Sequence, residues 1–180
     1  MLDSPRRVPI TETITAIEND QKDQQVVRQY TRSARYYYLS VSTARRWPLA
    51  HNVRILIIRL ETPDPGGLPT TVWTGEIPFQ WEHAQIQPAL RTLGRPTRAD
   101  FLVAAQDPVN LAQQNQLHLM TVIEPINMQR SHYSPTKFWV TVIAASDEND
   151  SPSLRLEVAW DGRWDAGETE MAQHLIIRPT

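Results

Sequence analysis

Short runs of alternating apolar and polar residues recur along this chain, separated by polar segments that contain proline. Alternation at a period of two is typical of a β-strand with one buried face. In Tyr36–Val41 this alternation places Tyr37, Leu39 and Val41 on one face, which we predict to be buried. Asn52–Glu61 is apolar at successive positions in its middle, which predicts a central strand that is covered on both faces.

The C-terminal third of the chain predicts an antiparallel pair of strands, Phe138–Ala144 and Leu154–Ala159, joined by the polar turn SDENDSPS. Asp161 and Gly162 form an Asp-Gly pair, the strongest short hairpin signal in the chain. A last apolar run, Leu175–Ile177, predicts the strand that closes the fold.

One segment, Gln85–Gly94, has helical rather than strand spacing. Pro88 suits the first turn of a helix and Gly94 suits the position just after its end, because glycine adopts the left-handed conformation that terminates many helices. We therefore predict one short helix near Pro88–Leu93.

Two shorter apolar runs near the N-terminus, Ile10–Ile17 and Val26–Tyr30, are further strand candidates, although the second also fits a helical turn. The 14 prolines lie between the apolar runs rather than within them, as they do in β-rich domains where proline would interrupt a ladder. The pattern predicts an all-β, immunoglobulin- or fibronectin-like sandwich of about seven to nine strands with one short helix. We assign residues 31–180 to this sandwich, with an insertion around 78–121, and residues 1–30 to an N-terminal arm or edge strand that docks on a neighbour.

Composition narrows the range of functions. The net charge is −2, with 20 carboxylates against 18 cations, which argues against a nucleic-acid-binding surface. There are 0 cysteines, so disulfides, thiolate catalysis and cysteine-ligated zinc are excluded, while the compartment stays open. Nothing approaches the length of about 18 apolar residues that a membrane-spanning helix needs, and the first residues contain no apolar stretch of the kind found in secretory signals.

Candidate chemistry is sparse. The sequence lacks the common metalloprotease, nucleophile-elbow and phosphate-loop motifs, and its histidines are far apart. Asp147, Glu148 and Asp150 could bind calcium, but their spacing is not that of a calcium loop and their place at a hairpin tip favours a solvated turn. We therefore predict no catalytic residue, no cofactor and no metal ion.

Aromatic residues are the remaining candidates for binding. Trp73, Trp81 and Trp164 fall near predicted turns, where an indole ring can contact a partner protein or a glycan. Packing into the core is the alternative reading for all three rings.

Two segments carry a resemblance to a known kind of domain. YYYLSVS followed by LAHNVRILIIRLE, with its Ala50-x-Asn52-Val53 step, resembles the passage between the second and third strands of bacterial fibronectin-III-like and CARDB-like sandwiches. FWVTVIAASDENDSPSLRLEVAWDG is similar to the last hairpin of the same domains. The resemblance runs from Tyr36 to the end of the chain, and it implies a sandwich fold and a binding role.

We expect a non-enzymatic protein-interaction or structural module, acting as a subunit of an assembly or as the soluble part of a larger protein. Its expected partner is another protein or a second copy of itself. One alternative is a carbohydrate-binding sandwich that stacks sugars on Trp73, Trp81 or Trp164. A second alternative is a hydrolase with an unrecognised site in the Pro78–Thr121 segment.

Overall fold

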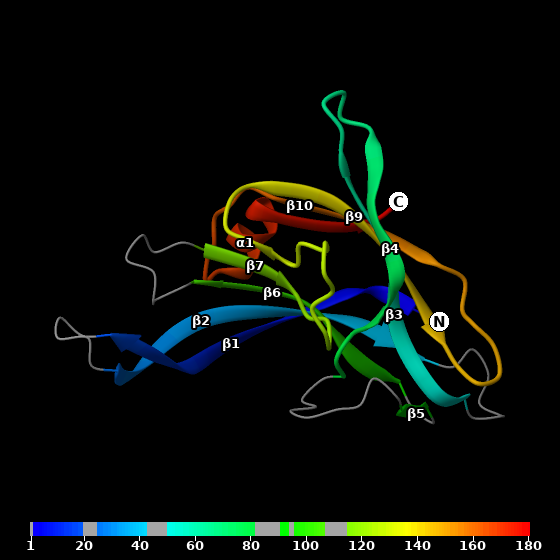
Figure 1. Ribbon diagram of the computed structural model, residues 1–180, viewed down its shortest axis with the longest axis horizontal. Coiled ribbons are helices and arrows are strands. Elements are labelled where there is room, and N and C mark those ends of the chain that lie inside the picture. The colour runs from blue at the N-terminus through cyan, green and yellow to red at the C-terminus, as the bar shows by residue number, and fades with distance from the viewer. Residues whose placement is uncertain (1, 20–24, 43–49, 82–90, 94–95, 107–114) are drawn as a thin grey trace.

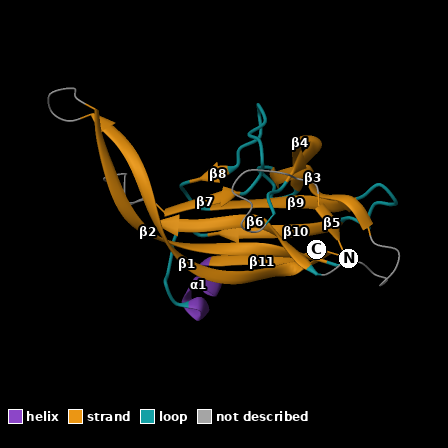
Figure 2. Cartoon of the chain, turned by 90° about the horizontal axis from the view of Figure 1, so that it is seen from below, coloured by secondary structure: helices purple, strands orange, loops and turns teal. Residues whose placement is uncertain are grey.

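The computed structural model describes residues 2–19, 25–42, 50–81, 91–93, 96–106 and 115–180. Within them the chain forms two antiparallel sheets that pack face to face (Figures 1 and 2). The first sheet has the order β1 (Leu2–Asn19), β2 (Gln25–Val41), β6 (Thr97–Gln106), β7 (Asn115–Leu119), β8 (Ser131–His132). The second has the order β11 (Leu175–Pro179), β10 (Leu154–Trp160), β9 (Thr136–Ala145), β3 (Ala50–Pro63), β4 (Pro69–Pro78). The predicted all-β sandwich is confirmed.

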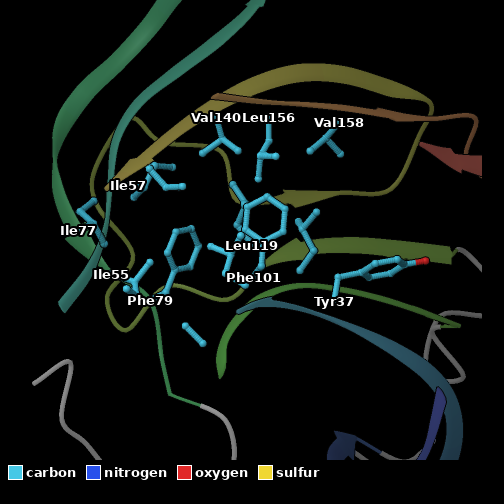
Figure 3. Close-up of a cluster of buried hydrophobic side chains, with 14 of the residues drawn as sticks. Tyr37, Ile55, Ile57, Ile77, Phe79, Phe101, Leu119, Val140, Leu156 and Val158 are labelled. Carbon is cyan, nitrogen blue, oxygen red and sulfur yellow. The ribbon is translucent and has the colours of Figure 1, made fainter. Parts of the chain in front are cut away.

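Apolar side chains from both sheets meet in one continuous core (Figure 3). Phe138 and Leu156 from the second sheet and Phe101 and Leu119 from the first are each 0% exposed. The ring of Phe79, on the segment that follows β4, packs edge-on against Phe101 with their centroids 5.7 Å apart. Burial of this apolar surface is the main term that stabilises the fold.

The strand patterns read from the sequence predict the buried side chains of the first sheet well. Tyr37, Leu39 and Val41 are exposed by only 1%, 0% and 1%. Tyr38 is also buried, at 2% exposed, but its ring stacks on that of Tyr36, so it lies on the other face of β2 and the alternation holds. The register shift between Tyr37 and Tyr38 places its extra residue, Phe101, in β6.

The second sheet also follows the prediction. β9 and β10 pair antiparallel in the expected register, with Phe138 opposite Val158 and Val140 opposite Leu156. β3 lies between β4 and β9 inside the sheet, as its apolar middle predicts.

The helix predicted near Pro88–Leu93 is wrong for Arg91–Leu93, the part of this segment that the structure describes. Arg91–Leu93 form β5, which pairs with β3, and Leu93 is buried in the core. Residues 82–90 and 94 lie outside the described residues. The described part of the chain has its helix, α1 (Glu168–His174), between β10 and β11. Only Met171 of α1 is buried, so the helix carries no apolar stripe that the sequence pattern could reveal.

The connections between the strands differ in part from the expectation. The described residues form strands β1 to β11, and without the very short β5 and β8 they agree with the expected seven to nine. Gly162 has the positive φ of a turn glycine, at 88°, but β10 and β11 are joined through residues 161–174, including α1, rather than by a tight hairpin. The predicted insertion around 78–121 contains β6 and β7, which supply core strands of the first sheet.

Leucine-to-alanine substitution tests this core. We expect Leu156→Ala to lower the free energy of unfolding by about 2–5 kcal/mol, because the side chain is fully buried and leaves a cavity between the sheets. The matched control is Leu68→Ala, since Leu68 is 68% exposed, and its effect should stay within about 0.5 kcal/mol. Urea denaturation followed by tryptophan fluorescence measures both, and similar losses for the two variants would contradict the assigned core.

Candidate functional site

The structure places Trp73 on β4 with its ring folded back along its own strand. A Cβ atom built on Gly75 would lie 2.5 Å from a ring carbon of Trp73, so the glycine makes room for the indole. Trp73 is half-buried and packs against the edge of the core. Part of the ring therefore stays accessible on β4.

The other two tryptophans, Trp81 and Trp164, contact β6 at two separate positions. Trp81 forms a bridge with Ala99 and is only 3% exposed, which leaves almost none of its surface to a ligand. Trp164 is half-buried, and its indole Nε1 donates a hydrogen bond of 3.1 Å to the carbonyl oxygen of Ala104. Ala99 and Ala104 are about 16 Å apart along a strand. The three rings predicted to contact a partner or glycan are thus not brought together into one platform.

A more prominent feature is the long hairpin formed by β1 and β2. β2 pairs with β6 only from Ala34 to Val41. Before Ala34 it continues through Gln25–Ser33, whose only partner among the described strands is β1, over Thr11–Asn19. Figure 1 shows this part of the hairpin extending away from the sandwich as a two-stranded ribbon, and Figure 2 shows the same from below. We call residues 10–19 and 25–33 the arm.

The arm has two edges that face no other described strand. A strand edge presents a row of backbone N–H and C=O groups that can pair with a further strand. A two-stranded hairpin is marginally stable in water when nothing else supports it. A ribbon of this length therefore presents exposed backbone groups that would gain from a partner.

Proline divides the edge of β1 into two parts. Pro5 and Pro9 lie in the part that runs beside the sandwich, where Pro9 stands opposite Arg35 of β2. Proline has no N–H to donate, so it protects an edge from pairing with other chains. The sequence contains no proline between Pro9 and Pro48, so the arm lacks this protection. This gap between prolines is the signal in the sequence that would have located the open edges.

Arg35 fixes the base of the arm. It lies on β2 just inside the sandwich, is 2% exposed, and its guanidinium donates a hydrogen bond to the carbonyl oxygen of Ala166. Ala166 belongs to the segment between β10 and α1, which comes from the second sheet. A buried guanidinium with a backbone acceptor thus ties the strand that becomes the arm to both halves of the sandwich.

Several apolar residues are exposed in loops. The loop after β7 presents Ile123 and Ile126, which are 56% and 89% exposed. The buried side chain of Met128 and the ion pair of 2.9 Å between Arg130 and Glu124 fix this loop in place. No pattern in the sequence indicates this loop, because isolated apolar residues in a loop carry no periodic signal.

Ser131 contacts His118 on the neighbouring strand, although His132 is its neighbour in the sequence. Ser131 pairs across the strands with His118, and its Oγ lies 2.7 Å from Nδ1 of that ring. His132 points the other way, stacks on Phe138 at 5.1 Å, and burial lowers its pKa. Since His118 stands opposite Val103, the Ser131–His118 pair lies on the outer face of the first sheet. Among the described residues no group of three or more His, Cys, Asp or Glu side chains could hold a metal ion.

The outer face of the second sheet is built around a buried tryptophan. Trp139 of β9 stands between Glu61 of β3 and Glu157 of β10, and Arg178 of β11 continues this row. Trp139 is 5% exposed although it lies outside the core. Arg178 lies 3.0 Å from a carboxylate oxygen of Glu157.

Two cations cover that tryptophan. Nζ of Lys137 lies 4.9 Å and the guanidinium carbon of Arg155 5.4 Å from the Trp139 ring, within range of a cation–π interaction. Arg155 also pairs with Glu61 at 2.9 Å, and Lys137 with Glu157 at 3.4 Å. Burial raises the pKa of Glu157, but its hydrogen bonds and charge interactions with Lys137 and Arg178 lower it overall. The charges of this face thus pair with one another.

The acidic turn between β9 and β10 contacts the start of β3. The backbone N–H of His51 donates to both carboxylate oxygens of Glu148, at 3.2 and 3.0 Å, and the ring Nδ1 lies 2.6 Å from one of them. Asn52, whose φ is 50°, donates a side-chain hydrogen bond to Asp147. These bonds from the His51 backbone and ring lower the pKa of Glu148 to about 2.

Comparison with known protein families, with characterised proteins and with solved structures finds no match to this chain. The resemblance to fibronectin-III-like and CARDB-like domains therefore stays a prediction. No helix among the described residues is long and apolar enough to cross a membrane.

The Glu148 contact predicts a pH-dependent stability difference. Because the folded-state pKa lies below the ordinary value of 4.5, the contact stabilises the fold above that pH and is lost as the pH falls toward about 2. We expect Glu148→Gln to lower the melting temperature at pH 6, with the difference from the wild type shrinking below pH 4.5. Asp150→Asn is the control on the same turn and should behave as the wild type. A Glu148→Gln difference that persists unchanged at pH 2 would contradict this assignment.

Proposed function

We propose that this chain is a non-enzymatic interaction module, a structural subunit that joins other protein chains through its arm. The observation that carries the proposal is the extension of β1 and β2 beyond the last residue of β2 that pairs with β6, Ala34. The extension runs away from the sandwich as a two-stranded ribbon (Figure 1), and it leaves two edges without a partner among the described strands.

Pairing along a strand edge suits such a subunit for physical reasons. An added strand forms backbone hydrogen bonds along its whole length, and the alternate side chains supply specificity. The arm is already extended and paired, so less conformational entropy is lost on binding than for a disordered segment. The Arg35–Ala166 hydrogen bond at its base supports the same role, because it connects the arm to a folded domain.

The outer face of the second sheet and the three tryptophans are less suited to binding a partner than the arm is. In the row around Trp139 each cation is paired with a carboxylate of the same row, so its charged groups are already engaged with one another. Trp81 is buried, and the accessible part of Trp73 is separate from Trp164. Among the described residues, the edges of the arm therefore offer a row of backbone groups to a further strand.

Removal of the arm tests the proposal. Ile10 and Ala34 stand directly opposite each other, so an Asn-Gly turn that replaces residues 11–33 closes a short hairpin without strain. We expect the full chain to sediment as an assembly, or to co-purify from its source cells with a partner protein. The shortened chain should sediment as a folded monomer of less than 20.7 kDa and lose the partner. Sedimentation velocity over a range of concentrations and native-state mass spectrometry measure both.

A second shortened hairpin serves as the control. Pro63 and Pro69 face each other at the end of β3 and β4, so replacing residues 64–68 with Asn-Gly shortens a projecting turn of the second sheet. This variant should keep the mass of the full chain. A full chain that is monomeric at all concentrations and has no partner, or a shortened arm that leaves assembly intact, would refute the proposed function.

A further inference from the structure

We infer that the partner of the arm is the arm of a second copy, with the outer edge of β1 in one copy pairing antiparallel with the outer edge of β2 in the next. This inference rests on the proposed function and names the occupant of its site. It follows from the charges of the two strands, from their register, and from the placement of proline.

The two strands of the arm carry opposite charges. Within Ile10–Asn19 the charged residues are Glu12 and Glu18, and within Gln25–Ser33 they are Arg28 and Arg32. Each copy therefore has one acidic edge strand and one basic edge strand. Pairing of β1 with β1, or of β2 with β2, would bring like charges together, whereas pairing of β1 with β2 brings opposite charges together. Opposite charges across neighbouring strands are favourable and like charges are not.

The same two strand sequences already pair within each chain. Glu12 stands opposite Arg32, Thr13 opposite Thr31 and Ile14 opposite Tyr30. A second β2 on the outer edge of β1 can repeat this register. In an antiparallel sheet the backbone groups of each residue point toward one neighbouring strand, and successive residues alternate between the two sides. Repeating the register keeps that alternation, so each strand would bond one neighbour through its odd positions and the other through its even positions.

This pairing sets the arrangement of the copies. A β2 that runs antiparallel to the neighbouring β1 runs parallel to the β2 of that neighbour, so the arms point in the same direction and the sandwiches stand on the same side. The contact is heterologous, because each copy uses a different edge toward each of its two neighbours. Such contacts repeat and close into a ring or continue as a helical filament. A sheet of several arms is also far more stable than the single hairpin.

Proline confines the contact to the arm. Pro5 and Pro9 interrupt the edge of β1 beside the sandwich, so pairing of neighbours stops where the arm meets the folded domain. The edge strands of the second sheet, β4 and β11, carry one charged residue each, Glu76 and Arg178, and Arg178 is already paired with Glu157.

Cysteine cross-linking tests the inference directly, since the chain has 0 cysteines and each introduced thiol is unique. Thr13→Cys and Thr31→Cys are made in separate chains that carry tags of different size, mixed, allowed to assemble, and oxidised gently. Because each thiol faces only one neighbouring copy in a heterologous assembly, random mixing in equal amounts should leave about half of the chains in a disulfide-linked dimer that contains one chain of each kind. Either variant alone should stay uncross-linked, because the facing position in its neighbour is threonine.

A second pair of variants repeats the test at another point of the register. Thr15→Cys and Gln29→Cys, whose parent residues also stand opposite each other, should cross-link in the same way when mixed. The double variant with both Thr13→Cys and Thr31→Cys in one chain is the control for geometry, because its two thiols stand opposite each other within the hairpin and can form a disulfide inside one chain. Circular dichroism checks that each variant is folded.

Each remaining outcome counts against the inference. Cross-linking of Thr13→Cys with itself would show two-fold pairing of β1 with β1 and overturn it. Absence of cross-linking in both mixtures, while the wild type still sediments as an assembly or retains a partner, would overturn it and leave the proposed function standing. A monomeric wild type without a partner would overturn both.

Discussion

The fold depends on β2, because one half of this strand pairs with β6 inside the sandwich and the other half pairs with β1 alone. The inner half carries Tyr37, Leu39 and Val41 into the core, and their burial stabilises the first sheet. The outer half pairs with β1 alone among the described strands and extends away from the sandwich (Figure 1). A single strand therefore divides the chain into a stable body and a projection, and the antiparallel ladder continues through the boundary at Ala34.

The features that the sequence predicts well are local ones. The period-two pattern of Tyr36–Val41 identifies its buried face, and the polar turn after Phe138–Ala144 identifies the partner and the register of the next strand. The helix could not be found in this way. Arg91–Leu93 carry a spacing that a helix and a strand share, and α1 buries Met171 alone. Tertiary contacts decide between such alternatives.

The candidate site was harder to predict than the fold. The N-terminal residues were expected to form an arm or an edge strand, but alternation within one strand does not show how many neighbours it has. That number depends on which part of β2 pairs with β6, a strand that lies far away in the sequence. Tryptophan likewise attracts a binding interpretation in a sequence, whereas only the packed structure shows that Trp81 is covered and that Trp164 bonds to Ala104.

The buried Arg35 has a mechanical consequence. Its guanidinium lies between the two sheets at the point where the ribbon leaves the body, and its hydrogen bond to Ala166 spans from β2 to the connection before α1. A joint made in this way resists bending, because tilting the ribbon would pull a charged group away from its acceptor in a region that water does not reach. This hydrogen bond therefore restrains the angle between ribbon and body. The curvature of any assembly built from such chains would then be determined by the angle within each single chain.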